Sequence, residues 1–446
     1  MPVLRLTEYN KIAVAPDGVR RQLEGGVLVP GTDYVALKNL YLASEVEHPG
    51  TEILRPCLWK NREALQARNY VGVIRTPSGL SLEIYPKTCS VDNAESRSRE
   101  LAVLLKMLCA VPDLPFQYAQ SAMLDTGRLP LLEIFIYCFL QEIAALLRHG
   151  IASDYIAREE NGPYLRGRLL VQQHLRHNCV QRHRFFVLHD HFLPDRPENR
   201  LIKTALCHVL LVSRDADNQR NCKLHLRAFD AVSVSPDIRK DSDRCRQDRN
   251  IQHYKNSLNW SRLLLGGQSP ALMSGVQNCL SVLFPMEVLF ERYVALKLRQ
   301  CLRPRDWTVK EQAGGHFLVE EHKGKAFYAL KPDLLLLKEG CCVIADTKWK
   351  IIACAEDIKR GGDLYQLFAY GEKCLPPSAT MQGPSFLIYP KTDNFPPALA
   401  PFYFRTEKAP LYAVAFDLEK DRCPAVENIL LRRDEPVSSV QLGGLK

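Results

Sequence analysis

Two carboxylates and a lysine in one short stretch of the chain have the residue types and spacing of a site that binds a divalent cation. The stretch contains two apolar runs, YALKPDLLLLK and CCVIADTKWKII, joined by a Glu-Gly connection, and this pattern predicts a β-hairpin. Each run carries one isolated acid, Asp333 or Asp346. Because residues i and i+2 of a strand share a face, Lys348 is predicted to lie beside Asp346, with Thr347 facing the other way. Buried acids are unfavourable by several kcal/mol unless they are paired or bind a metal, so the pattern favours a cation site.

The residues around this hairpin resemble the PD-(D/E)xK signature of metal-dependent nucleases. Pro-Asp at 332–333 followed by Asp-Thr-Lys at 346–348 is similar to the signature itself. Downstream, QLFAY at 366–370 resembles the QxxxY element of the RecB-like branch, and upstream LFERYV at 289–294 is similar to the helix that supplies its first acid. That acid would be Glu291. Glu287 lies one helical turn earlier and is the alternative.

The resemblance implies Mg²⁺ as the cofactor, with Mn²⁺ as a substitute. The residues it assigns to the metal are Asp333, Asp346, Glu291 and Thr347, the last through a backbone carbonyl. Lys348 would orient or help to deprotonate the attacking water and stabilise the developing charge. Gln366 and Tyr370 would position the site or grip the DNA backbone.

The tripeptide [DE]xK also occurs elsewhere in the chain. Glu321-His-Lys323 and Asp357-Ile-Lys359 both have polar surroundings, and we expect them to be solvated. Only the Asp346 tripeptide combines a hairpin, an upstream Pro-Asp, a Glu-bearing helix and a Gln/Tyr helix.

Length and composition indicate a globular protein of two or three domains. The 446 residues are 46% hydrophobic and 24% charged, with a net charge of +9 that suits a polyanionic partner. The 15 cysteines are scattered without zinc-type spacing, which is typical of reduced thiols in a cytoplasmic protein. No signal peptide is recognised. The most apolar helix, predicted over 131–147, contains Glu133, Gln141 and Glu142 and is expected in a core rather than a membrane.

Three regions follow from the changes in hydrophobic period, and together they predict an α/β (α+β) multidomain protein. Residues 1–95 alternate as strands, with a hairpin connection at 76–79. Residues 96–265 are predicted to be a helical middle region, with a tight turn at 160–162. Residues 266–446 form the third domain, a mixed sheet flanked by helices in which one helix, kinked at Pro285, carries Glu291.

The middle region also holds a run of arginine and histidine, RHNCVQRHR at 176–184. A solvated loop and a phosphate-contacting surface are both open interpretations. The histidines of this part of the chain follow no helical His₂ motif, so a metal cluster is not expected among them. They are His174, His177, His183, His189 and His191.

The N-terminal half extends the resemblance. The segments VGVI…LEIYPK, LRGRL and PENRLIKTAL are similar to those of the McrC family, the nuclease subunits of modification-dependent (5-methylcytosine-type) McrBC restriction systems. The resemblance implies a DNA endonuclease whose N-terminal half, with residues 1–95 as the partner-docking domain, docks on a separate AAA+ GTPase motor, McrB-like, and stimulates it. The chain has no GxxxxGK[ST] loop, which fits this division of work. A catalytically inactive motor-activating subunit and a stand-alone DNA repair nuclease remain the alternatives.

Overall fold

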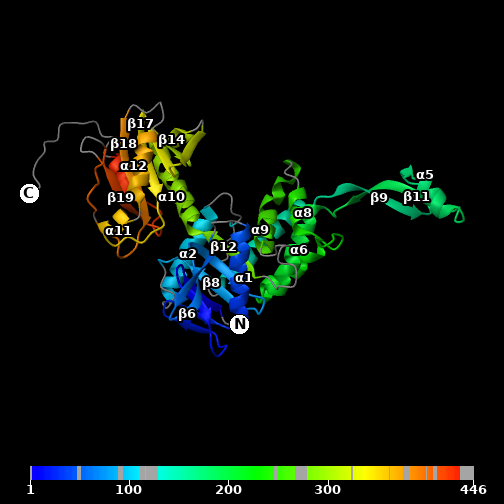
Figure 1. The fold of residues 1–446 in the computed structure, drawn as a ribbon. Coiled ribbons are helices and arrows are strands. Elements are labelled where there is room, and N and C mark those ends of the chain that lie inside the picture. Colours follow the sequence, from blue (N-terminus) through cyan, green and yellow to red (C-terminus); the bar gives the residue numbers. More distant parts are fainter. Residues whose placement is uncertain are drawn as a thin grey trace, which may run out of the picture.

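The computed structural model has three lobes and one long arm. It describes residues 3–47, 52–88, 94–110, 116, 129–245, 249–266, 279–322, 325–360, 362–374, 381–397, 399–404 and 409–431. The C-terminal sheet lies at one end of the molecule, the N-terminal sheets and helices occupy the middle, and the arm projects from the opposite end (Figure 1). Mixed sheets and many helices make this an α+β multidomain fold, as the sequence predicts.

Two sheets form the N-terminal lobe. The first has the order β3-β4-β2-β6-β5 and the second the order β1-β8-β7-β12, with the turn at 76–79 joining β7 to β8 as predicted. Helix α1 (Gly31–Glu47) packs between them. The strand bounds are β1 Val3–Thr7, β2 Lys11–Val14, β3 Arg21–Leu23, β4 Gly26–Val29, β5 Leu54–Trp59, β6 Arg62–Ala67, β7 Tyr70–Arg75, β8 Ser81–Tyr85 and β12 Leu280–Pro285.

Strand β12 corrects the predicted helix around Pro285. Its residues alternate between buried and half-buried and pair antiparallel with β7, so the segment before Pro285 is extended and only α10 (Met286–Leu302) is helical. Proline lacks the N–H that a helix interior needs, and here it is the residue at which the helix begins. As a consequence, α10 starts at the edge of the N-terminal sheet and runs to the C-terminal lobe (Figure 1).

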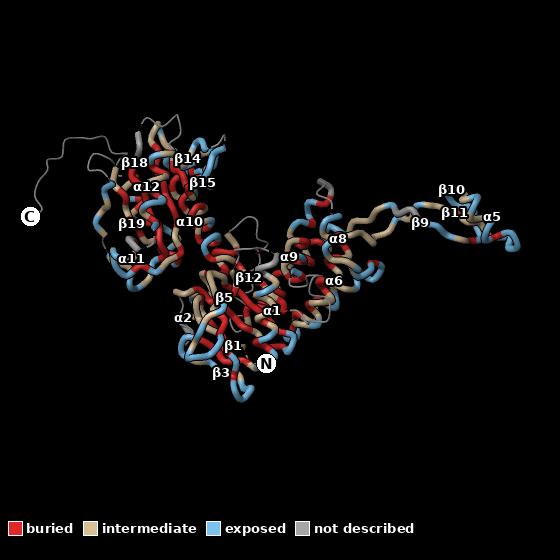
Figure 2. Tube along the Cα trace, viewed as in Figure 1, coloured by how far each residue is buried: buried red, intermediate tan, exposed pale blue. Residues whose placement is uncertain are grey.

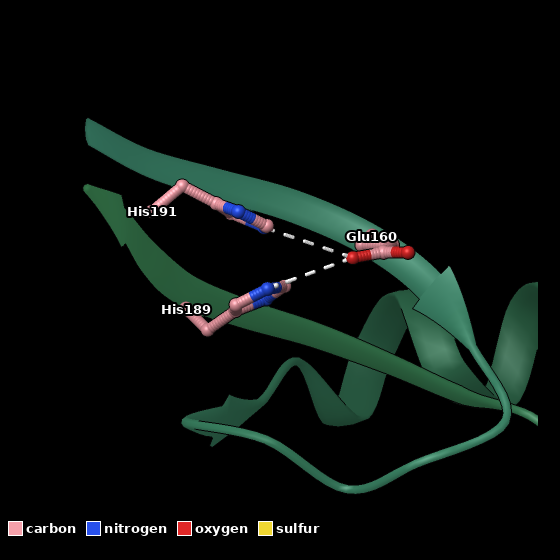
Figure 3. Close-up of side chains that lie close together, drawn as sticks. All are labelled: Glu160, His189 and His191. Carbon is pink, nitrogen blue, oxygen red and sulfur yellow. Dashed lines mark ion pairs between the residues drawn. The ribbon is translucent and has the colours of Figure 1, made fainter. Parts of the chain in front are cut away.

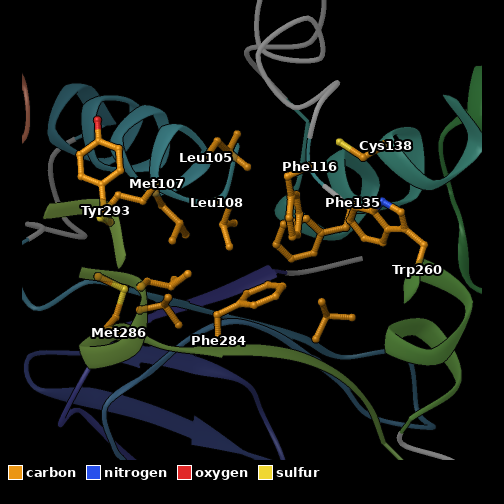
Figure 4. Close-up of a cluster of buried hydrophobic side chains, with 14 of the residues drawn as sticks. Leu105, Met107, Leu108, Phe116, Phe135, Cys138, Trp260, Phe284, Met286 and Tyr293 are labelled. Carbon is orange, nitrogen blue, oxygen red and sulfur yellow. The ribbon is translucent and has the colours of Figure 1, made fainter. Parts of the chain in front are cut away.

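The middle helices form a hub between the N-terminal and C-terminal lobes. Phe116, Phe135, Trp260 and Phe284 pack edge to face in one buried cluster that joins α4 and α9 to β12 (Figure 4). The same cluster continues along α10 into the C-terminal sheet. The bounds are α2 Ala94–Ala110, α4 Leu131–His149, α6 Pro197–Val212, α7 Ala216–Arg227, α8 Ile238–Arg244, a 3₁₀ turn Arg249–Tyr254 and α9 Lys255–Leu265.

The arm interrupts the region predicted to be helical. Strands β9 (Asp154–Gly162) and β11 (Phe185–Leu193) form a long antiparallel ribbon, and its tip carries β10 (Arg168–Leu169) and α5 (Val171–Asn178). The tight turn expected at 160–162 is therefore wrong, because these residues continue β9 in register with β11. Little of the arm is buried compared with the three lobes (Figure 2).

The C-terminal lobe is a mixed five-stranded sheet of order β13-β16-β17-β18-β19, with helices on both faces as predicted. A two-stranded ribbon, β14 with β15, lies beside it. The bounds are a 3₁₀ turn Arg303–Arg305, β13 Thr308–Glu311, β14 His316–His322, β15 Lys325–Leu330, β16 Leu334–Lys338, β17 Cys341–Thr347, α11 Ala355–Arg360, α12 Asp363–Lys373, β18 Met381–Pro390, β19 Leu411–Phe416 and α13 Pro424–Leu431. Over the described parts of the chain, no helix combines the length and apolar character needed to cross a membrane.

Candidate active site

The predicted hairpin is present at the centre of the C-terminal sheet. Strands β16 and β17 pair antiparallel, and Glu339 and Gly340 connect them with positive φ angles of 44° and 77°. Alternate residues of β17 face opposite sides: Val343 and Ala345 pack in the cluster under α10, whereas Ile344 packs in the cluster under α12. Asp346 continues the face of Ile344, so the hairpin presents its acid on the side of α12.

Asp346 and Lys348 form the close pair that their spacing predicts. The Lys348 Nζ lies 2.5 Å from Asp346 Oδ2, and only 1% of the Asp346 side chain is exposed. Lys348 and Asp346 thus form an ion pair through Oδ2, while Asp346 Oδ1 has no hydrogen-bond partner among the described residues. A buried carboxylate that retains one unused acceptor oxygen is suited to a cation ligand.

Asp333 lies beside the same strand end. Its Oδ2 accepts hydrogen bonds from the Thr347 backbone N–H at 2.8 Å and from Thr347 Oγ1 at 2.7 Å. These bonds fix the carboxylate against β17 and leave its other oxygen outside this pairing. The Thr347 side chain therefore orients Asp333, which the sequence did not indicate.

Helix α10 decides between the two candidate glutamates. Glu291 faces Asp333, and Gln312 donates a hydrogen bond to its carboxylate. Glu287 lies one turn earlier and accepts a hydrogen bond from Asn69 Nδ2 at 2.6 Å, so it belongs to the contact with the N-terminal lobe. The structure thus groups Glu291, and not Glu287, with the hairpin acids.

Gln366 and Tyr370 lie on α12, which covers the face of β17 that carries Asp346. The Gln366 Nε2 donates to Tyr370 Oη at 2.6 Å. Burial raises the pKa of Tyr370, and the negative charge of Asp346 adds to this effect. The phenol is therefore near the acids, and exposed Gln366 is linked to it by this hydrogen bond.

The electrostatics reflect this crowding of charge. The pKa of Asp346 is raised to about 7, with burial as the largest cause, the charge of nearby Asp333 adding to it and Lys348 opposing both. Burial, followed by the charge of Asp333, also raises the pKa of Glu291. Burial alone would lower the pKa of Lys348, but the adjacent Asp346 outweighs it and raises that pKa. The site brings three acids together with one lysine, and a bound divalent cation would reduce the repulsion between the acids.

Comparison with known proteins places this chain in a family. The sequence profile of the family described as "McrBC 5-methylcytosine restriction system component" matches residues 65–390, which is most of the chain. The chain belongs to this McrBC family. No curated protein matches it.

Two solved structures share the McrBC fold. One is the refined half-complex from the tetradecameric assembly of Thermococcus gammatolerans McrB AAA+ hexamers with bound McrC, with 18% identity, a TM-score of 0.67, and coverage of 97% of this chain and 100% of that one. The other is the cryo-EM structure of the Thermococcus gammatolerans McrBC complex, with 19% identity, a TM-score of 0.50, and coverage of 68% and 88%. At these identities the likeness is one of fold.

The site of this McrBC family member includes a second ion pair that the sequence analysis missed. Buried Asp363, at the start of α12, accepts from Lys350 Nζ at 2.6 and 2.9 Å and from Tyr389 Oη at 3.1 Å. Its negative charge contributes to the raised pKa of Asp346. The signal was available, because Lys350 follows Lys348 by two residues and could share its face.

The two other [DE]xK tripeptides lie apart from the site. Asp357 accepts hydrogen bonds from the backbone N–H groups of Ala353 and Cys354 at 3.0 and 3.1 Å, where it stabilises the start of α11. Glu321 is exposed on β14, and Lys323 lies outside the described residues. Asp357 therefore has a structural role.

Proposed function

We propose that this chain is the DNA endonuclease subunit of a 5-methylcytosine-type restriction system, with a PD-(D/E)xK nuclease domain at its C-terminal end. The observation that carries the proposal is the grouping of Asp333, Asp346 and Glu291 around Lys348, with Oδ1 of buried Asp346 lacking a hydrogen-bond partner among the described residues. A hydrolytic metal site needs such a free acceptor oxygen.

The donor set is the one that Mg²⁺ requires, and Mn²⁺ would substitute. Asp333 and Asp346 would hold the ion, Glu291 would complete or support its shell, and a backbone carbonyl near Thr347 is a further candidate ligand. Bound Mg²⁺ supplies Lewis-acid activation of water and of the scissile phosphodiester. The chain's own contribution is a strand end that buries Asp346 on the side of α12 and holds Asp333 through Thr347.

Lys348 is the residue proposed to act on the water. Its ammonium is held by Asp346 and has its pKa raised there, so it is charged at neutral pH and can orient the water and stabilise charge on the phosphate. Tyr370, oriented by Gln366, is proposed to position the site or the DNA backbone. Both roles depend on α12 packing over β17.

The proposed partner is an AAA+ GTPase motor, because the structures that share the fold contain McrB hexamers with bound McrC. We assign docking to the N-terminal half. Within it, the arm has the features of a contact element, since it projects from the body with exposed apolar side chains at its tip. They include Tyr164, Leu165, Leu175 and Val180. Double-stranded DNA is the proposed substrate, and the cytoplasm the proposed site of action.

The test is cleavage of methylated DNA by the chain together with its motor partner, GTP and Mg²⁺. We expect Asp333→Asn, Asp346→Asn and Lys348→Ala each to reduce cleavage by roughly 10²–10³-fold or more while the protein stays folded. Asp357→Asn is the matched control from a tripeptide of the same form and should cut like the unmodified protein. Cleavage by the triple variant, or in excess EDTA, at the unmodified rate would overturn the proposal.

A further inference from the structure

The arm contains a second cluster of potential metal ligands, far from the hairpin site. His189 and His191 lie two residues apart on β11 and share a face, and Glu160 on β9 points between their rings (Figure 3). One ligand atom from each residue lies within 4.8 Å of the other two. No sequence motif joins these residues, because Glu160 is distant in the chain and becomes a neighbour of the two histidines through strand pairing.

The distances between the candidate ligand atoms are close to those between neighbouring ligands of a tetrahedral metal ion. Glu160 Oε2 lies 3.5 Å from His189 Nε2 and 3.8 Å from His191 Nε2. Zinc bonds to histidine and carboxylate of about 2.0–2.1 Å place neighbouring ligand atoms roughly 3.3–3.4 Å apart. Small rotations of the three side chains would therefore bring their ligand atoms to bonding distance of one ion. The same separations are too long for good hydrogen bonds.

The polar atoms of the cluster are also poorly satisfied as they stand. Among the described residues, His189 Nδ1 and His191 Nε2 are buried and have no hydrogen-bond partner. The two rings stand with centroids only 4.1 Å apart, which is unfavourable if both are charged. An ion bound by neutral imidazoles would give His191 Nε2 a partner and avoid two charged rings side by side.

The loop before β10 shelters the cluster. Gly167 has a φ of +69°, and a Cβ there would lie 2.4 Å from the Leu188 carbonyl oxygen and 2.7 Å from His189 Cβ. Only glycine lets the loop pass this close over β11, and the His189 side chain is left 12% exposed. Glu160 is 52% exposed, so one side of the cluster remains open to water.

We infer that Glu160, His189 and His191 bind Zn²⁺, with water in the fourth position, and that the ion joins β9 to β11. Two imidazoles and one carboxylate favour zinc over Mg²⁺ or Ca²⁺, which prefer oxygen ligands. Such a link would stabilise the arm. A ribbon of two long strands is only marginally stable in water, and no arm residue belongs to a hydrophobic cluster of the described chain.

The experiment is zinc binding by the full chain after removal of metals with EDTA. It is done in the Asp346→Asn background, so that the hairpin site does not contribute. After addition of equimolar Zn²⁺ and desalting, elemental analysis should find one zinc per chain, and Co²⁺ should give the visible absorption of a four-coordinate site. His189→Gln with His191→Gln should lose both signals. His183→Gln, an exposed histidine of the same arm, should keep them.

Hydrogen exchange supplies the readout for the arm itself. Zinc should slow exchange of the β9 and β11 amides in the parent and in His183→Gln, and leave it unchanged in the double variant. Glu160→Gln keeps the side-chain shape, so its metal-free exchange should match that of the parent while its zinc is lost on desalting. Failure of the parent to retain zinc, or equal retention by the double variant, would refute the site.

Discussion

The indole Nε1 of Trp349 donates a hydrogen bond to Glu8 Oε2 at 2.9 Å, so the residue after Lys348 is held by the first strand region of the chain. Lys87 completes the contact by donating to the Trp349 carbonyl. Burial raises the pKa of Glu8, an effect that the Trp349 hydrogen bond opposes. The N-terminal lobe is therefore hydrogen-bonded to the chain immediately after the strand that carries Asp346.

We expect Trp349→Phe to lower both stability and cleavage. The variant keeps an aromatic ring but leaves buried Glu8 without its indole donor, a loss of about 1–3 kcal/mol. Trp307→Phe is the matched control, because the buried Trp307 Nε1 has no hydrogen-bond partner among the described residues. Thermal unfolding and DNA cleavage of the two variants are the measurements. Equal effects of both would show that the Glu8 contact contributes nothing.

The two glutamates of α10 should behave differently. Glu291→Gln should reduce Mg²⁺-dependent cleavage by about tenfold or more, because it removes a charge from the metal shell. Glu287→Gln should cut normally, since its amide oxygen can still accept from Asn69. Cleavage rates measured over a series of Mg²⁺ concentrations distinguish them. A larger defect in Glu287→Gln would reverse the assignment.

The raised pKa of Asp346 makes a prediction about stability and pH. Its ordinary pKa is 3.8, and in the folded protein it is about 7. Between these values the folded state holds a proton that the unfolded state has lost, so stability falls as pH rises through this window and the effect is constant above it. Asp346→Asn should therefore raise the unfolding temperature of the metal-free protein most above pH 7.

The measurement is thermal unfolding of both proteins in EDTA from pH 5 to pH 8. The advantage of Asp346→Asn should grow with pH up to about 7 and then level off. Because bound Mg²⁺ requires the ionised acid, added Mg²⁺ should stabilise the unmodified protein more at pH 8 than at pH 6. A pH-independent difference between the two proteins would contradict the burial of an ionisable acid at this position.

Calcium should separate binding from cleavage. Ca²⁺ has a larger and looser shell than Mg²⁺ and positions water less well, so it should support DNA binding while cleavage is slow. DNA binding and cleavage are compared with Mg²⁺, Mn²⁺ and Ca²⁺ in turn. Efficient cutting with Ca²⁺ would argue against the proposed water-orienting role of Lys348.

Stimulation of the partner's GTP turnover should depend on the arm and not on the acids of the hairpin site. Asp346→Ala should still raise the GTP turnover of the partner. Deletion of residues 1–95 is a poor test, because it removes β7 and uncovers β12. A sharper variant joins Tyr155 to Phe192, which are paired across the arm, through a two-residue Asn-Gly turn.

The arm-shortened variant should remain folded and lose stimulation of the partner. GTP turnover by the partner ring with each variant is the measurement. Stimulation that survives shortening of the arm would move the docking surface to another part of the N-terminal half. Stimulation lost with Asp346→Ala alone would place it at the nuclease domain.

Local pattern was sufficient to predict the hairpin and the pairing of its side chains. The alternation of β17 has a period of two whatever the rest of the fold does, so Asp346 and Lys348 had to share a face once the strand formed. The core helix α4 and the helix of Gln366 and Tyr370 were predictable for the same reason, since each has a long apolar period of its own.

Tertiary structure decided the contacts between distant segments. Glu287 and Glu291 share a helix face, and only the packing of α10 shows which one meets Asp333. Pairing with β7 made β12 a strand, although its apolar run also suits a helix. The Glu8–Trp349 bond depends on how whole lobes pack, and the grouping of Glu160 with two histidines depends on strand register. Neither of these contacts produces a periodic pattern in the sequence that could have predicted it.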